Sequence, residues 1–145
     1  MTLFLDHVFT ITAELAEPRE VGRTPAGHRR VIGITGGTVE GPALRGEVLP
    51  GGADWNVVRP DGAVHVWARY ELRSVAGAVI SVVNEGLAGP PGEGVTRASW
   101  WCPTRPVFEV ADPDLAWLNT GFFLGELRPG GENRVTIAVQ RVVAG

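Results

Sequence analysis

The chain has 145 residues, a formal net charge of −3, thirteen arginines and no lysine. This length suits one domain, residues 1–145, and scattered arginines with a weakly negative total charge argue against a nucleic-acid partner. The absence of lysine excludes Schiff-base catalysis, pyridoxal-phosphate attachment and a P-loop lysine.

The cysteine content and the hydropathy pattern restrict the environment of the protein. Cys102 is the only cysteine, so an intramolecular disulfide and a CxxC metal site are both excluded. No apolar run approaches the ~18 residues of a membrane span, and the N-terminus lacks the pattern of a secretion signal. We therefore expect a cytoplasmic protein with no membrane partner.

Short runs of β-branched and aromatic residues alternate with turn residues along the whole chain, about every eight to twelve residues. This spacing predicts an all-β fold: a single antiparallel up-and-down β-barrel of about eight to ten strands with one short helix. Closure buries the apolar face of the sheet and removes its exposed edges. A two-sheet sandwich is the alternative. The predicted strands are 4–15, 29–35, 39–49, 55–59, 64–74, 79–85, 97–101, 107–110, 122–127 and 134–143.

Turn residues divide these strands. Segment 18–27 is predicted as a loop, and Asp61-Gly62 after Pro60 predicts a tight hairpin turn. The glycine- and proline-rich segment 87–94 predicts a mobile loop, suited to a lid or rim. A helix is predicted from Asp112, its N-cap, to about residue 121.

The segment Gly51-Gly52-Ala53-Asp54-Trp55 combines a sharp bend with two side chains that could line a cavity mouth. Asp54 would supply a carboxyl group for proton transfer, and Trp55 an apolar wall for a substrate. The alternative is a glycine bulge with Asp54 bonded to local amides and Trp55 in the core.

The strand 64–74 has two distinct faces, because polar and apolar residues alternate along it. If the polar face lines the barrel, then His65, Trp67 and Arg69 would contact a ligand, with Arg69 orienting a carbonyl. Otherwise that face is the solvated exterior. Tyr70 lies on the other face and is the only phenol in the chain, suited either to proton transfer or to the core.

A second aromatic group comes from the last third of the chain. Trp101, Glu109 and Trp117 would add indoles and a carboxylate to a substrate-binding wall. Asn119 could donate a hydrogen bond to a substrate carbonyl, or it could cap the end of the helix.

Several mechanisms are excluded by spacing. His7, His28 and His65 lie far apart and show no metal-ligand spacing, so no metal is expected. Cys102, flanked by Trp101 and Pro103, is interpreted as a small buried apolar residue and not as a nucleophile. The glycines at 33–37 do not match a dinucleotide or phosphate loop. We therefore expect no cofactor.

Five segments together form a recognisable family pattern: 31–42, 49–55, 59–62, 68–70 and 117–119. In these segments the chain resembles the domain-of-unknown-function 3237 family, whose members are uncharacterised small β-barrels that are often dimeric. This resemblance implies a small antiparallel barrel and a homodimer. The chain departs from the family pattern at Trp67, where an Asp is usual, and at 101–104, which suggests a more apolar pocket for a bulkier ligand.

The leading functional hypothesis is a cofactor-independent enzyme of the cyclase, isomerase or lyase type, acting on a hydrophobic biosynthetic intermediate. Asp54, Arg69, Tyr70 and Asn119 would be catalytic, in an aromatic-lined pocket. A non-catalytic binding or carrier barrel is the main alternative, and a structural module without a cavity is the third. An open pocket above ~300 Å³ would separate the first two hypotheses from the last.

Overall fold

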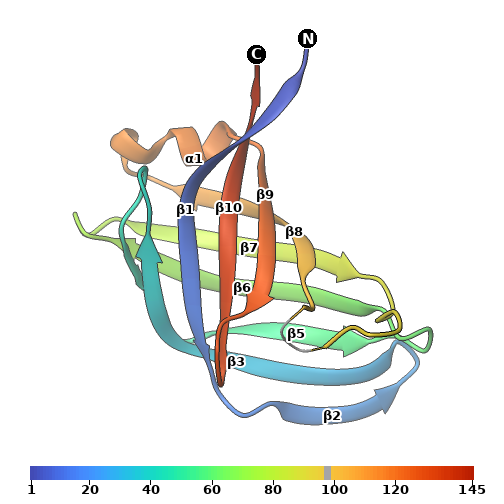
Figure 1. Cartoon of the computed structure of the whole chain (residues 1–145). Coiled ribbons are helices and arrows are strands. Elements are labelled where there is room, and N and C mark those ends of the chain that lie inside the picture. Colours follow the sequence, from blue (N-terminus) through green and yellow to red (C-terminus); the bar gives the residue numbers. More distant parts are fainter. Residues whose placement is uncertain (97–98) are drawn as a thin grey trace.

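The computed structural model describes residues 1–96 and 99–145. Ten strands and two short helical turns follow one another along the chain (Figure 1). The strands are β1 (Leu3–Leu15), β2 (Arg19–Thr24), β3 (Gly27–Glu40), β4 (Gly46–Val48), β5 (Gly52–Val58), β6 (Val64–Ser74), β7 (Val79–Ala88), β8 (Cys102–Val110), β9 (Phe123–Pro129) and β10 (Arg134–Ala144).

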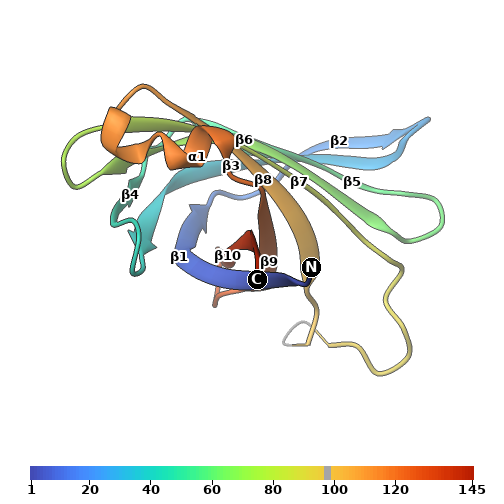
Figure 2. The same ribbon diagram turned by 90° about the horizontal axis from the view of Figure 1, so that it is seen from above.

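The strands close into an antiparallel barrel, which confirms the predicted fold over the sandwich. Eight strands form the closed cycle in the order β1, β10, β9, β8, β7, β6, β5 and β3, and pairing of β1 with β3 completes it (Figures 1 and 2). β4 pairs with β3 and β6 at the end of these strands that β5 does not reach. Within the described residues, β2 pairs with β3 alone.

Three predicted segments differ from the structure. The expected loop at 18–27 contains β2. The expected strand 29–35 continues without a break to Glu40 in β3. Of the expected strand 39–49, residues 39–40 belong to β3 and residues 46–48 form β4. β3 is not broken at Gly36-Gly37 because Gly37 adopts φ +142°, and a Cβ there would overlap the carbonyl oxygen of Thr12 on the neighbouring strand. The glycines permit close approach to β1. Of the expected strand 97–101, residues 97–98 lie outside the described residues, and 99–101 precede β8 without strand structure.

One end of the barrel is filled. The rings of Phe9 and Phe123 contact that of Phe108 edge to face, with centroids 5.7 and 5.2 Å apart. The predicted helix is split into η1 (Pro113–Leu115) and the single turn α1 (Trp117–Thr120). Asp112 is its N-cap as predicted, and Leu118 of α1 is buried in the core.

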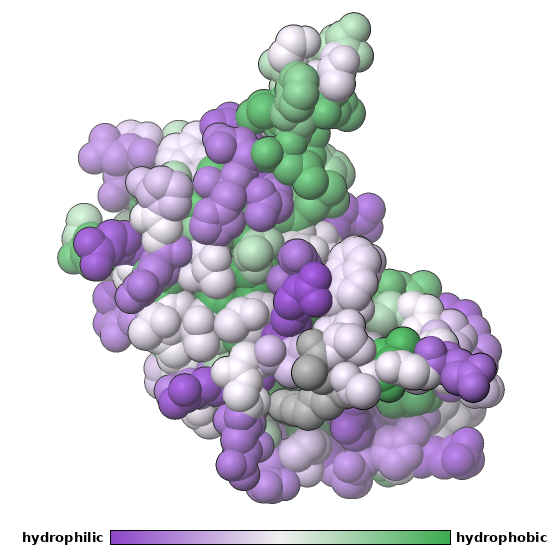
Figure 3. Space-filling view, viewed as in Figure 1, coloured by the Kyte–Doolittle hydropathy of each residue, from purple (hydrophilic) through white to green (hydrophobic). Residues whose placement is uncertain are grey.

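The first and last strands continue past the barrel beside α1. Residues 3–7 of β1 pair with 140–144 of β10, and the two chain ends project together (Figure 1). Leu3, Phe4 and Leu5 leave apolar side chains exposed on this projection, visible as the green protrusion in Figure 3.

Candidate functional site

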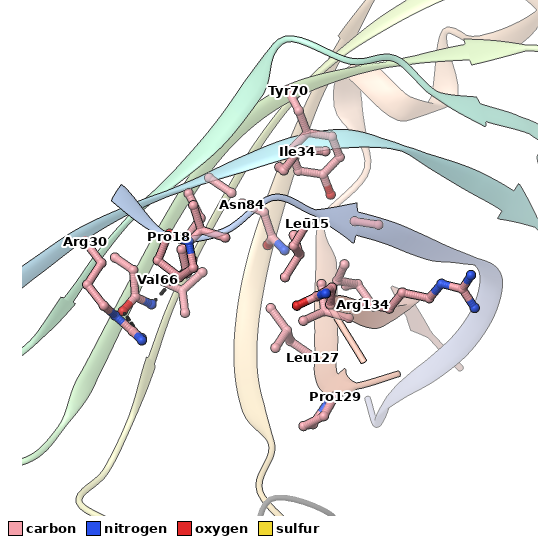
Figure 4. Close-up of a pocket in the computed structure, with 18 of the residues that line it drawn as sticks. Leu15, Pro18, Arg30, Ile34, Val66, Tyr70, Asn84, Leu127, Pro129 and Arg134 are labelled. Carbon is pink, nitrogen blue, oxygen red and sulfur yellow. Dashed lines mark hydrogen bonds between the residues drawn. The ribbon is translucent and has the colours of Figure 1, made fainter. Parts of the chain in front are cut away.

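The half of the barrel away from α1 is hollow. It contains a cavity of about 410 Å³, which falls within the usual range for small-molecule sites. Exposed Pro18, Asn133 and Arg134 border its mouth together with Trp100 and Pro129 (Figure 4). The walls are mainly aliphatic and include small residues that leave the space open: Ala13, Leu15, Ile32, Ile34, Val64, Val66, Ala68, Leu127, Val135 and Ile137.

A chain of polar side chains crosses one wall of this cavity. Asp54 and Asn56 are two residues apart on β5, so they share its inward face, and Arg30 is the direct partner of Asn56 on β3. The Arg30 Nη2 donates to Asn56 Oδ1 at 2.9 Å, and Asn56 Nδ2 donates to Asp54 Oδ2 at 3.4 Å.

Asp54 is held in place by the backbone of the next strand. Its Oδ1 accepts a hydrogen bond from the Trp67 N–H at 3.0 Å. Burial raises the pKa of the Asp54 carboxyl above its ordinary value of 3.8, and this outweighs the lowering effects of its hydrogen bonds and of the charges on Arg30 and His65. The protonated form is therefore more accessible than in an exposed aspartate, and the carboxylate is a stronger base.

Two further polar groups face the cavity and have no hydrogen-bond partner in the part of the chain that the structure describes. Tyr70 lies on the inward face of β6, and its buried hydroxyl makes no hydrogen bond within the described chain. Burial raises the pKa of this phenol, so it remains protonated and can donate. The Oδ1 of Asn84, on β7 opposite Ala68, is also buried and unpaired among the described residues. A ligand could satisfy both groups (Figure 4).

His65, Trp67 and Arg69 lie outside the cavity, so of the two interpretations of the polar face of this strand, the solvated exterior is the one that agrees with the structure. The inward face of β6 carries its apolar residues, from Val64 to Leu72. His65 Nε2 lies 2.8 Å from Glu85 Oε2 on the outer surface. The polar face of this strand is the exterior because the apolar face must fill the barrel.

The outer surface also contains Trp55. Its ring lies edge to face with that of Trp67, at a centroid distance of 5.8 Å. Trp55 and Arg69 border a separate surface depression of about 250 Å³.

The remaining predicted site residues also lie away from the cavity. Trp101 is exposed, with the Arg128 guanidinium 5.9 Å from its ring centre, and Glu109 is exposed on β8. Trp117 packs on Phe123 at the closed end. Asn119 receives a hydrogen bond from the Val110 N–H at 2.8 Å and donates to the Val110 carbonyl at 2.9 Å, so its amide anchors the helical turns to β8.

The structure therefore brings together Asp54 and Tyr70 from the predicted set and adds Arg30, Asn56 and Asn84. Asn56 could have been found, because two-residue spacing from Asp54 places both on one face of a strand. Arg30 and Asn84 could be placed at the cavity only once the register between neighbouring strands was known. Trp100, and not Trp101, reaches the cavity.

The described side chains also bear on metal binding and on the reactivity of the thiol. The described residues contain no group of three or more side chains able to hold a metal ion. Cys102 is fully buried, and burial together with the Asp54 charge raises its pKa to about 11, which disfavours the reactive thiolate. Among the described helices, none is long and apolar enough to cross a membrane.

A family model described as "Protein of unknown function (DUF3237)" matches residues 4–142. The chain belongs to this family. A UPF0311 protein of Rhodopseudomonas palustris is 36% identical over 151 residues, covering 98% of each chain. A UPF0311 protein of Clostridium acetobutylicum is 35% identical over 129 residues, covering 82% of each.

Solved structures similar to this DUF3237 protein include a Rhodopseudomonas palustris protein of unknown function, with TM-score 0.88, 37% identity and 99% coverage of each chain. A β-barrel-like protein from Acinetobacter baumannii has TM-score 0.88 and 27% identity, covering 99% of this chain and 98% of that one. A structure described as an enzyme from Penicillium herquei has TM-score 0.75 and 20% identity, covering 99% and 96%, and shows similarity of fold alone.

Proposed function

We propose that the protein is a cofactor-independent enzyme of the cyclase, isomerase or lyase type that moves a proton within a hydrophobic small molecule bound in the barrel. One observation carries this proposal. A carboxyl group with a raised pKa, Asp54, lines the same apolar cavity as the Tyr70 hydroxyl and Asn84 Oδ1, which have no partner among the described residues.

The two oxygens of Asp54 would have different roles in this reaction, because their hydrogen bonds differ. Oδ1 accepts the Trp67 N–H, whereas among the described residues Oδ2 accepts only the longer bond from Asn56. Oδ2 would therefore accept a proton from a carbon next to a carbonyl group. Returning the proton to a different carbon of the enolate gives an isomer. In a cyclase, the enolate carbon would attack a carbonyl carbon of the same molecule; the new C–C bond replaces the π bond of that carbonyl, and the proton goes to the resulting alkoxide, so the composition does not change. In a lyase, the enolate would expel a leaving group from the next carbon as its own carbonyl re-forms, and the proton would leave with that group.

Tyr70 and Asn84 would position the carbonyl group. The Tyr70 phenol can donate to the carbonyl oxygen and stabilise the negative charge that develops when the carbon is deprotonated. Its raised pKa makes it a donor and not a base. The aliphatic walls would exclude water and hold the substrate.

Isotope exchange tests proton transfer before the natural substrate is known. We expect the protein to accelerate deuterium uptake at the enolisable carbon of 2-tetralone in D2O, followed by proton NMR. Asp54→Asn should lower the acceleration about 100-fold or more. Glu71→Gln, which changes an exposed carboxylate next to Tyr70 in the sequence, is the matched control and should have no effect.

A carrier barrel is the second candidate, because the same apolar cavity would suffice for it. Binding of 2-tetralone without accelerated exchange would reject proton transfer on this substrate class and favour the carrier. Equal acceleration by the wild-type protein and Asp54→Asn would remove Asp54 from the mechanism.

A further inference from the structure

The arginine in the cavity wall lacks a counter-charge. The Arg30 guanidinium borders the cavity and uses Nη2 to bind the neutral amide of Asn56. Its Nε is buried and makes no hydrogen bond within the described chain. No carboxylate of the described residues lies within ion-pair distance of it, that is, within 4.0 Å.

The position of the Arg30 charge costs free energy when no ligand is bound. Arginine does not lose its charge in proteins, and a partly buried charge without an ionic partner is costly. The nearest carboxyl along the polar chain is Asp54, but Asn56 separates the two. Burial also favours the neutral form of Asp54, which weakens it as a counter-ion.

The other arginine at this cavity differs in both respects. Arg134 lies at the mouth, is exposed, and has its Nη2 3.7 Å from Glu14 Oε1. The neighbour of Arg30 in the sequence, Arg29, points to the other face of β3, where its Nη1 donates to the Trp55 carbonyl at 2.9 Å. Arg30 is therefore the cavity arginine whose charge is left for a ligand.

We propose that the natural ligand is an apolar carboxylic acid whose carboxylate binds the Arg30 guanidinium, in which Nε has no hydrogen-bond partner among the described residues. The proposal adds a ligand class to the proposed function, and it rests on that function only because both use the same cavity. The apolar part of the ligand extends from Arg30 along the aliphatic wall towards Tyr70 and Asn84 (Figure 4). The carboxylate supplies both the charge and the acceptor that Arg30 lacks.

A matched pair of probes tests this assignment. 2-Naphthoate and 2-naphthamide have nearly the same shape and differ in charge. Each would be titrated against N-phenyl-1-naphthylamine, a neutral fluorescent probe, bound to the wild-type protein. We expect the dissociation constant of the acid, obtained from displacement of the probe, to be at least about 10-fold lower than that of the amide.

Two variants locate the charge that is responsible. Arg30→Gln should abolish the preference for the acid while keeping the affinity for the neutral probe, which shows that the cavity is intact. Arg134→Gln removes an equal charge from the mouth and should keep the preference. Loss of the preference in Arg134→Gln but not in Arg30→Gln would overturn the proposal.

The failures are distinguishable. Binding of the neutral probe with no preference for the acid in the wild-type protein overturns the carboxylate site alone. No binding of any of the three compounds overturns the lumen as a ligand site, and with it the proposed function. If Arg30→Gln does not fold, NMR of the wild-type protein decides: the Arg30 Nε–H resonance should shift with naphthoate and not with naphthamide, and an unshifted resonance rejects the proposal.

Discussion

The carboxylate of Asp54 accepts a hydrogen bond from the backbone N–H of Trp67, although the Trp67 side chain lies on the opposite face of the sheet. The contact fixes the carboxyl group inside the barrel through a group that a substitution of the Trp67 side chain does not remove. Asp54 can therefore be changed separately from the aromatic pair that Trp67 forms with Trp55 on the exterior.

The raised pKa of Asp54 predicts a pH-dependent cost to stability. Because the folded protein holds this proton more tightly than the unfolded chain, the contribution of Asp54 to stability is greatest below its ordinary pKa of 3.8 and is lost as pH rises through the folded value. Asp54→Asn lacks this loss. We therefore expect the free energy of unfolding of Asp54→Asn, relative to wild type, to increase from pH 4 to pH 7.

Urea denaturation across this pH range measures the difference. Asp6→Asn, at an exposed position on β1, is measured alongside as the control for the loss of one carboxylate from the chain. A wild-type protein that gains stability over Asp54→Asn with rising pH would contradict the raised pKa.

The unpaired hydroxyl of Tyr70 predicts an unusual response to its removal. A buried polar group without a partner costs free energy, so Tyr70→Phe should leave the free energy of unfolding unchanged or increase it by about 1 kcal/mol. Chemical denaturation checks this expectation. A loss of more than about 1 kcal/mol would mean that the hydroxyl has a stabilising partner in the free protein.

Asn119 is predicted to act on stability and not on the ligand. Asn119→Ala removes both hydrogen bonds to Val110 and should lower the free energy of unfolding by about 1–2 kcal/mol. Thr120→Ala, at the neighbouring exposed position, should have little effect. Probe binding in the lumen should be equal in both variants, and weaker binding in Asn119→Ala alone would restore a role in ligand contact.

Gly52 is predicted to be needed for the position of Tyr70. A Cβ at residue 52 would overlap the Tyr70 Cβ and the Arg69 carbonyl oxygen across the strand pair. Gly52→Ala should therefore cost about 1–3 kcal/mol and weaken probe binding. Gly89→Ala is the control, because a Cβ there meets nothing within 4 Å. Equal stability of the two variants would contradict this role.

The barrel could be predicted from the sequence because turn residues and alternating apolar runs are local signals. The sequence predicts the bounds of the strand at 64–74 correctly. It does not predict which face lines the barrel, because each face carries an aromatic residue, Trp67 or Tyr70. What decides the orientation is the closure of the sheet, which needs one continuous apolar interior. That requirement involves every strand at once and is not visible in any single one.

The polar wall of the cavity could be predicted only in part. Asp54 and Asn56 come from one strand, so their shared face follows from their spacing. Arg30 lies beside Asn56 because of the register of β3 against β5, although the two residues are 26 positions apart in the sequence. The adjacent arginines at 29 and 30 look alike in the sequence, and strand pairing alone sends one inward and the other outward.

The division of the barrel into reactive wall and entrance has a consequence for how new specificities can arise. Arg30, Asp54 and Tyr70 come from the hydrogen-bonded strands β3, β5 and β6. Of the five entrance residues, Pro129 and Arg134 end or begin a strand, whereas Pro18, Trp100 and Asn133 come from connecting segments. Connecting segments tolerate substitution and changes of length better than paired strands. Relatives with the same polar wall could therefore accept ligands of different size through changes at the entrance, and the same positions are where redesign of the protein should begin.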